Sequence, residues 1–174
     1  LLIQYGADLN ALDGGGNSSL ASACYACRPE VARLLLNKGA NLNIKTKAGA
    51  TPLMAATANG CPALVKMLLD EGADVNEKDT EGFTALMHAA AKGRVDIAKL
   101  LLDKGADVNA TETLGGTALM IAAHDGGTDM VKTLLERGAD AKAKEQSGKT
   151  AHSMAVQRGH GEVVQLLEKR EGAR

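Results

Sequence analysis

Two cysteines, Cys24 and Cys27, stand two residues apart in the stretch CYACRP at residues 24–29. Zinc sites and thioredoxin-like dithiol pairs both use this spacing. A zinc site needs further ligands, and the sequence offers no second pair nearby, since His88 and His124 lie far along the chain. A dithiol pair needs a flanking strand and helix, which the surrounding residues do not predict. The meaning of the two cysteines therefore depends on the larger pattern of the chain.

No set of residues typical of an enzyme is recognisable in the sequence. There is no Ser-His-Asp arrangement and no pair of carboxylates in a pattern typical of acid–base catalysis. The glycine-rich stretches DGGG and LGG are not followed by Gly-Lys-Thr, which a phosphate-binding loop would require. We therefore expect no catalytic activity, no bound metal and no cofactor.

The composition argues against several classes of function. The 174 residues include 20 Lys and Arg against 21 Asp and Glu, so the excess of positive charge typical of proteins that bind nucleic acids or anionic membranes is missing. No apolar run approaches the ~20 residues that span a bilayer. Two Tyr and one Phe are the only aromatic residues, so the core must consist of Leu, Val, Ala and Met. Three cysteines, an odd number, do not suggest a disulfide framework, and we expect an intracellular, cytoplasmic protein.

Three series of residues recur every 33 positions along the chain, which identifies a tandem repeat. The first series is Gly-Ala-Asp or Gly-Ala-Asn, which begins at Gly6, Gly39, Gly72, Gly105 and Gly138. The second series is a Ser or Thr at Ser18, Thr51, Thr84, Thr117 and Thr150. The third series is a glycine two residues earlier, at Gly16, Gly49, Gly82, Gly115 and Gly148.

Each period predicts a helix, a turn, a second helix and an extended loop. In residues 84–110, Thr84 is expected to cap a first helix that continues to Ala91, and Gly93 is expected to end it. A second helix follows, in which Leu100 and Leu101 contribute to a buried face. A glycine then closes the second helix, and an extended loop leads to the next repeat.

This pattern resembles the ankyrin repeat family. The stretches KAGATPLMAATANG, TEGFTALMHAAAKGR and TLGGTALMIAAHDGG match its consensus D-x-x-G-x-T-P-L-H-x-A-A, and the resemblance covers essentially the whole chain. It implies an all-α fold, an α-solenoid of stacked 33-residue helix–turn–helix–loop repeats with short β-hairpin-like loops. One departure is that Met54, Met87 and Met120 replace the family's His, which implies weaker links from the first helix to the loop backbone.

The register predicts a half repeat followed by five repeats, at residues 1–12, 13–45, 46–78, 79–111, 112–144 and 145–174. In the last repeat, His152 and Glu168 replace leucines of the earlier repeats, so we expect it to cap the stack with a polar outer face. At the other end, Leu1 to Ile3 match the middle of a second helix, so we expect further repeat sequence on the N-terminal side.

The same register assigns a position to each cysteine. Cys24 occupies a small, partly buried position of a first helix, and Cys27 replaces the glycine that ends this helix in the other repeats. Cys61 lies one position later in the next repeat and is expected near Cys27 in space. The main prediction is that all three cysteines are structural, and a redox-sensitive pairing of Cys27 with Cys61 stays open.

The resemblance implies a non-catalytic protein-interaction module that binds through the concave surface formed by loop tips and first helices. Phe83, at a loop position that the fold does not require to be apolar, and Leu114, at the next loop tip, are the expected anchors, because exposed apolar groups ringed by polar ones are typical of binding hot spots. Tyr25 is a further candidate. The polar rim is expected to comprise Glu81, Lys92, His124, Asp125, Lys149 and Arg158. In the alternative, Phe83 packs against the neighbouring loop and only supports stacking.

Mixed charge along this surface favours a protein or peptide partner over a nucleic acid. We expect no membrane partner. We also expect a monomeric chain. The rival hypothesis is a structural spacer or regulatory arm of a larger protein. The loop asparagines Asn43, Asn76 and Asn109, each with a Leu eight residues earlier, resemble substrates of asparaginyl hydroxylation. In the alternative, their side chains only hydrogen-bond the loops.

Overall fold

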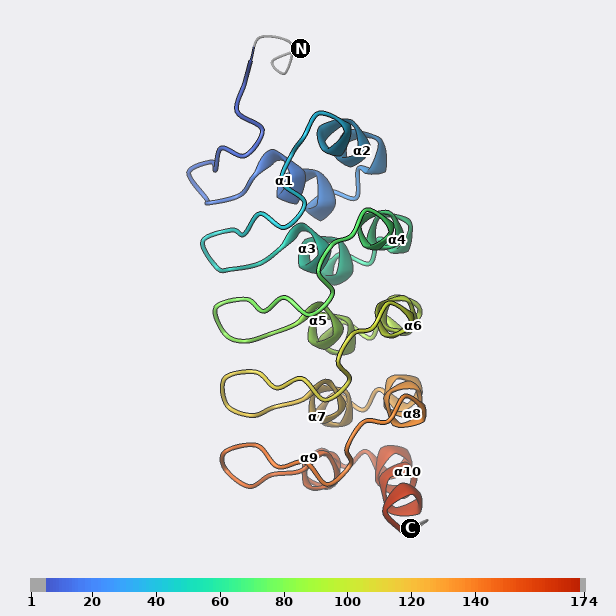
Figure 1. Ribbon diagram of the computed structural model, residues 1–174. Coiled ribbons are helices and arrows are strands. Elements are labelled where there is room, and N and C mark those ends of the chain that lie inside the picture. Colours follow the sequence, from blue (N-terminus) through green and yellow to red (C-terminus); the bar gives the residue numbers. More distant parts are fainter. Residues whose placement is uncertain (1–5, 173–174) are drawn as a thin grey trace.

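The computed structural model describes residues 6–172, which form ten helices arranged as five stacked pairs (Figure 1). The first helices of the pairs are α1 (Ser19–Tyr25), α3 (Pro52–Ala58), α5 (Ala85–Ala91), α7 (Ala118–His124) and α9 (Ala151–Arg158). The second helices are α2 (Pro29–Asn37), α4 (Pro62–Asp70), α6 (Val95–Asp103), α8 (Thr128–Glu136) and α10 (Gly161–Gly172). The predicted all-α solenoid is confirmed.

Each first helix begins directly after a Ser or Thr whose hydroxyl caps it. The Oγ1 atom of Thr84 accepts a hydrogen bond from the Met87 amide at 3.4 Å, and that of Thr117 accepts one from the Met120 amide at 3.3 Å. Both threonines are buried. Because a cap of this kind typically stabilises a helix by about 1 kcal/mol, the recurrence of Ser or Thr also fixes where the helices recur.

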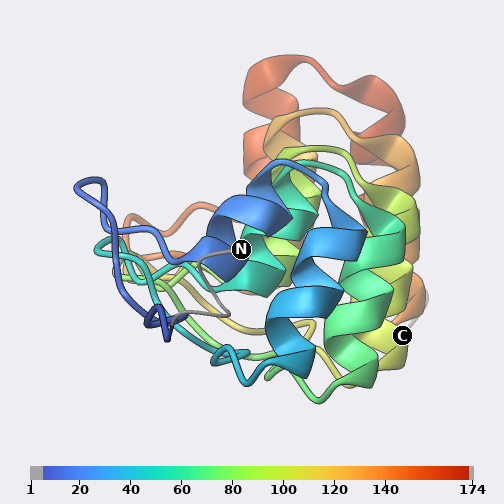
Figure 2. The same ribbon diagram turned by 90° about the horizontal axis from the view of Figure 1, so that it is seen from above.

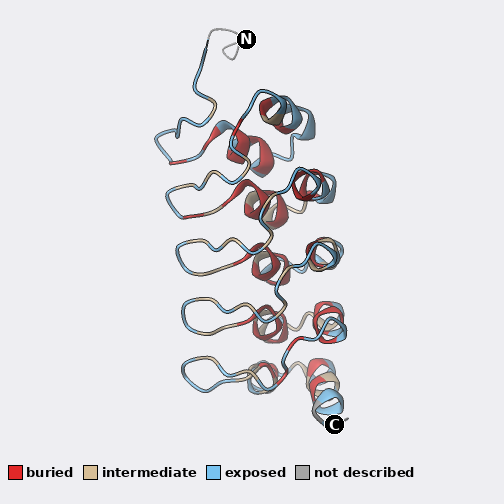
Figure 3. Ribbon diagram, viewed as in Figure 1, coloured by how far each residue is buried: buried red, intermediate tan, exposed pale blue. Residues whose placement is uncertain are grey.

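The core lies between the layer of first helices and the layer of second helices, and it continues from one pair to the next (Figure 3). Leu53, Leu86 and Leu119 occupy the same position in successive repeats and are at most 2% exposed. Ala56 and Ala89, also equivalent, are fully buried. Such small side chains let neighbouring first helices approach one another closely, which explains a stack built almost without aromatic residues.

Three methionines take the first-helix position where the resemblance predicts a His. Met54, Met87 and Met120 are all buried in the core. The Sδ atom of Met54 accepts a hydrogen bond from the Thr51 amide at 3.4 Å. The methionines thus fill core volume at this position, and the loop contacts described next do not depend on them.

The loops between the pairs project to one side of the helices, as the view along the stack shows (Figure 2). Each loop closes on itself like a hairpin: the Asp79 amide donates to the Phe83 carbonyl and the Gly82 amide to the Asp79 carbonyl, both at 3.0 Å. Among residues 6–172, only Thr111 and Thr117 form a β-bridge. The hairpin-like loops are therefore short turns rather than strands.

Adjacent loop tips are hydrogen-bonded to one another. The Thr80 amide donates to the Ala48 carbonyl at 3.0 Å, and 33 residues later the Thr113 amide donates to the Glu81 carbonyl at the same distance. This ladder holds the loop tips in a row beside the first helices.

The two ends of the stack differ. At the C-terminal end, His152 Nε2 lies 3.5 Å from a carboxylate oxygen of Glu168, so both polar replacements in the last repeat meet on its surface. At the other end, Val31 and Leu34 of α2 are about half exposed. The expected helix at Leu1 to Ile3 lies outside the described residues.

Candidate functional site

A hollow of about 760 Å³ lies between the loop tips and the first helices over the last three helix pairs, and we call it the apolar groove. Its apolar surface comes from Phe83, Leu114, Met120, Ile121 and Met154. Its rim carries Thr80, Glu81, Glu112, Thr113, Gly116, His124, Asp125, Glu145, Ser147 and Lys149. Helices α7 and α9 supply the helical side, and three successive loops supply the other.

Phe83 is partly buried at one end of the groove. Its amide donates to Oδ1 of Asp79 at 2.8 Å, which fixes the loop beneath it. Its ring packs on the core and lies 5.7 Å, centroid to centroid, from the ring of His88. Phe83 therefore packs inward on the core and His88, and it also lines the groove.

Leu114 is the most exposed apolar residue of the groove, with 58% of its surface accessible. The backbone around it is fixed, since its amide donates to Oε2 of Glu112 at 2.8 Å and its carbonyl accepts from the Gln146 amide at 2.8 Å. A large apolar side chain is thus held at a rigid loop tip without a packing partner that would bury it.

A polar network lies at the helical side of the groove. His124 Nδ1 is 2.8 Å from Oδ1 of Asp125, and its Nε2 is 2.9 Å from Nε of Arg158. Because a guanidinium only donates, Nε2 is the acceptor and the ring proton lies on Nδ1, directed to Asp125. His160 Nε2 also donates to the His124 carbonyl at 3.0 Å. The network holds the His124 ring in one orientation.

Carboxylates outnumber cations on the rim. The rim carries four carboxylates and one lysine: Glu81, Glu112, Asp125, Glu145 and Lys149. The Glu145 carboxylate accepts hydrogen bonds from the side chain and amide of Ser147, which lower its pKa. The groove is therefore apolar inside and acidic at its edge.

A second, smaller hollow of about 380 Å³ lies along the same side of the stack near its N-terminal end. Tyr25, Met54, Ala58 and His88 are among its lining residues, and Tyr25 is 69% exposed. Among the described residues 6–172, no Asp, Glu, Lys or Arg lines it. The two hollows therefore differ in charge.

Family models match almost the entire chain. One described as ankyrin repeats (3 copies) matches residues 42–112 and 110–174, and another, described as ankyrin repeats (many copies), matches residues 2–53. The chain belongs to the ankyrin-repeat family. Comparison with curated proteins finds no match. Ankyrin repeats are generally non-catalytic modules for protein–protein interaction.

The apolar groove brings together six of the nine partner-contact residues predicted from the sequence of this ankyrin chain. They are Phe83, Leu114, Glu81, His124, Asp125 and Lys149. Arg158 lies outside the groove lining and reaches it through His124, whereas Tyr25 lines the second hollow. Lys92 is exposed but lines neither hollow.

Sequence reasoning missed the helical floor of the groove. Met120, Ile121 and Met154 were not predicted as contact residues, although Met120 was already noted as a departure from the ankyrin pattern. Glu112 and Glu145 were assigned only as repeat starts. Their shared spacing of 33 residues is the signal that could have placed both carboxylates on one rim.

The loop asparagines join successive repeats of the ankyrin stack. The Oδ1 atom of Asn76 accepts from the Asp107 amide at 2.8 Å, and its Nδ2 donates to the Gly105 carbonyl at 3.2 Å. Asn43 and Asn109 accept equivalent bonds from the next repeat. These amides therefore have a structural role.

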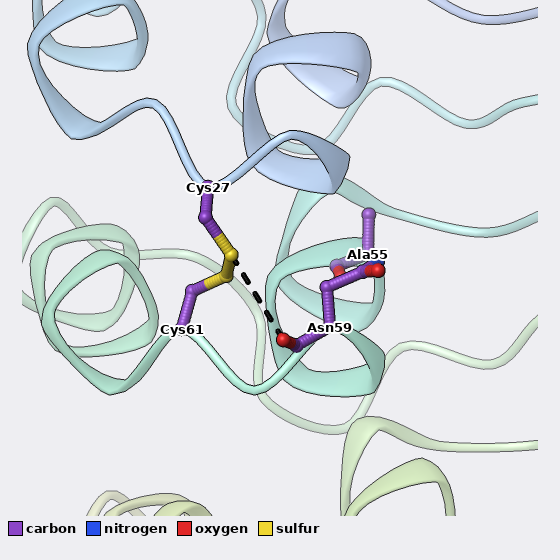
Figure 4. The surroundings of a disulfide bond; sticks show 4 residues. All are labelled: Cys27, Ala55, Asn59 and Cys61. Atoms are coloured by element: carbon purple, nitrogen blue, oxygen red, sulfur yellow. Dashed lines mark hydrogen bonds between the residues drawn. A yellow bond between two sulfur atoms is a disulfide. The ribbon is translucent and has the colours of Figure 1, made fainter.

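Cys24 and Cys27, the pair that suggested metal or redox chemistry, lie in different surroundings in the fold. Cys24 is fully buried in the core, and burial raises the pKa of its thiol to about 12, so it stays protonated. Cys27 instead forms a disulfide with Cys61 of the next repeat, with 5.8 Å between their Cα atoms (Figure 4). The expected proximity of Cys27 and Cys61 is confirmed, and the pairing that the sequence left open is the one that the structure contains.

Within residues 6–172, no helix has both the length and the apolar character needed to cross a bilayer. Over the same residues, no three His, Cys, Asp or Glu side chains come together as a candidate metal site.

Proposed function

We propose that this ankyrin array binds a protein or peptide partner in the apolar groove and catalyses no reaction itself. The observation that carries the proposal is Leu114, a large apolar side chain held rigid and exposed beside a hollow that is already shaped. Binding hot spots typically combine such an anchor with a polar rim. A hollow of this size also falls in the range typical of binding sites.

The predicted contact residues have different roles in this proposal. Phe83 and Leu114 are the anchors, and Glu81, His124, Asp125 and Lys149 contact polar groups of the partner. The other predicted contacts act from the periphery, Arg158 by holding His124, Tyr25 in the second hollow and Lys92 beside the groove. We also propose that the array is a monomer that divides into repeats at the boundaries given by the 33-residue register.

A nucleic-acid partner is disfavoured by the rim. Four carboxylates face the groove, and phosphate groups would be repelled by them. A cytoplasmic location remains a proposal, and the disulfide weighs against it, because disulfides persist mainly in oxidising compartments. Alkylation of free thiols at the moment of cell lysis tests the location. Three free cysteines would support the cytoplasm, and one free cysteine would support an oxidising compartment.

Hydroxylation of Asn43, Asn76 and Asn109 also stays a proposal. Because each side chain is hydrogen-bonded to the next repeat, an enzyme would reach it only after the loop opens locally. Mass spectrometry of the protein from its own cells would show the gain of one oxygen atom on a loop peptide. Unmodified peptides at all three positions would contradict the proposal.

The test of the binding function makes the same substitution at two exposed leucines. Leu114→Ser removes the anchor, whereas Leu34→Ser removes a leucine of similar exposure on α2, away from the groove. We expect a partner isolated with the parent chain to lose most of its affinity for Leu114→Ser and none for Leu34→Ser, measured by calorimetry. Equal affinity of all three chains would contradict the proposal and favour a structural spacer or regulatory arm.

A further inference from the structure

The charge of the apolar groove gives information about the partner. Its carboxylates come from both sides, with Glu81 on a loop tip and Asp125 at the end of α7. Glu81 forms no ion pair with any of residues 6–172, and Asp125 pairs only with the neutral ring of His124. Negative charge therefore borders the hollow from the loops and from the helices.

The remaining two carboxylates are fixed in place. Glu112 accepts hydrogen bonds from the amides of Leu114 and Gly116 at 2.8 and 2.7 Å. Glu145 accepts one from the Ser147 amide at 2.9 Å. These bonds hold the carboxylates of Glu112 and Glu145 at the rim.

Positive charge of the protein itself does not balance this rim. Lys149 is the one Lys or Arg in the lining. The guanidinium of Arg158 is bound to His124 and lies outside the lining. A partner that brings no cation would leave Glu81 and Asp125 without a balancing charge while water is displaced from the hollow.

We propose that the groove recognises a basic linear peptide segment of a partner protein, in which a large apolar side chain stands next to a Lys or Arg. The apolar side chain occupies the hollow between Phe83 and Leu114, and the cation lies between Glu81 and Asp125. This inference rests on the proposed binding function. Because the second hollow has no charged lining residue, the basic residue is selected only at the apolar groove.

The experiment uses a displayed library of random peptides, selected on the full chain. We expect the bound peptides to share an apolar residue adjacent to Lys or Arg. Their affinity should fall several-fold for Leu114→Ser. For Glu81→Gln it should fall about two- to five-fold, as expected for one exposed ion pair, and less at high salt. Glu71→Gln, which removes an exposed carboxylate outside the groove, is the matched control and should change nothing.

A charge exchange makes the test specific. Glu81→Lys should weaken the binding of a peptide that carries the Lys. Replacing that Lys by Glu should cost less affinity for the Glu81→Lys variant than for the unchanged chain, because Asp125 is present in both. Peptides that depend on Leu114 but share no basic residue would overturn this inference and leave the binding function standing. A library that yields no peptide dependent on Leu114 would overturn both.

Discussion

At Cys27 the backbone geometry lowers the stability of the folded protein, whereas the disulfide raises it. Four other repeats have a glycine at this position with φ between 62° and 75°, and Cys27 adopts a φ of 50° in the same left-handed region. A residue with a Cβ atom is disfavoured there by about 1 kcal/mol. The disulfide to Cys61 offsets this cost by linking two repeats across 34 positions of sequence.

Cys27→Gly should therefore change the stability with opposite signs in two buffers. Under oxidising conditions it removes the disulfide, which is worth roughly 2–4 kcal/mol, and relieves about 1 kcal/mol of backbone cost, so the free energy of unfolding should fall by about 1–3 kcal/mol. Under reducing conditions the substitution relieves only the backbone cost, and the free energy of unfolding should rise by up to about 1 kcal/mol. Urea denaturation with and without a reductant measures both.

Cys27→Ser is the matched control, because it removes the disulfide and keeps the backbone cost. It should destabilise the oxidised protein and leave the reduced one nearly unchanged. A change of the same sign for Cys27→Gly in both buffers would contradict this account of the position.

At the scale of elements, the loops matter most, since they position the proposed anchors Phe83 and Leu114. Gly82 has a φ of +85°, and a Cβ atom placed on it would lie 2.9 Å from the backbone nitrogen of Thr113 in the next loop. Gly148 has a φ of +82°, and a Cβ atom there would meet nothing within 4 Å. The two glycines share the backbone requirement and differ in whether a neighbouring loop packs against them.

Gly82→Ala should therefore destabilise the protein more than Gly148→Ala. The left-handed backbone alone costs about 1–2 kcal/mol for alanine at either position, and at Gly82 the clash with the next loop adds to it. Thermal unfolding of the two variants measures the difference. Equal melting temperatures would show that contact between loops adds nothing to the stack.

Neighbouring second helices are linked by charge. Asp70, at the end of α4, accepts hydrogen bonds from Lys104 at 2.8 Å and from Lys66 at 2.6 Å, and these lower its pKa from an ordinary 3.8 to about 2. Because the pKa is lower in the folded protein, this contribution to stability is present above pH ~4 and is lost as the pH falls through about 2.

Asp70→Asn should make the unfolding free energy less dependent on pH between about 4 and 2. The carboxylate is exposed, so the effect should be small and should weaken further in high salt. Denaturation curves at stepped pH, in low and high salt, measure it. An unchanged pH dependence would show that this link between repeats is not formed in solution.

The repeat register predicted the elements, but it could not predict how side chains from different elements converge. Thr84 and Gly93 fix the limits of a helix within one repeat, and both are visible in the sequence. The meeting of Met120, Ile121 and Met154 under Leu114 depends on how one repeat stacks on the next. No local pattern records this stacking.

At the scale of the whole molecule, stability should depend on the place of a residue along the stack. Met67 of α4 and Leu34 of α2 are equivalent, one repeat apart, yet Met67 is 8% exposed and Leu34 is 51% exposed. In the stack α4 lies between α2 and α6, whereas among residues 6–172 no second helix precedes α2 (Figure 1). A repeat contributes to stability through its neighbours.

Met67→Lys should thus lower the free energy of unfolding by several kcal/mol, since it buries a charge without a partner. Leu34→Lys should change it by no more than about 0.5 kcal/mol. Urea denaturation of both variants tests this. A similar loss for both would show that the α2 face is covered in solution.

The proposed binding of partners in the apolar groove, between the loop tips and the first helices, can be followed at the methyl groups that line it. The most direct measurement is an NMR titration of the methyl groups of the full chain with a peptide selected on it. We expect shifts concentrated at Leu114, Met120, Ile121 and Met154, with Leu34 and the methyl groups of the second helices unchanged. Shifts confined to the second helices or to the ends of the stack would contradict it.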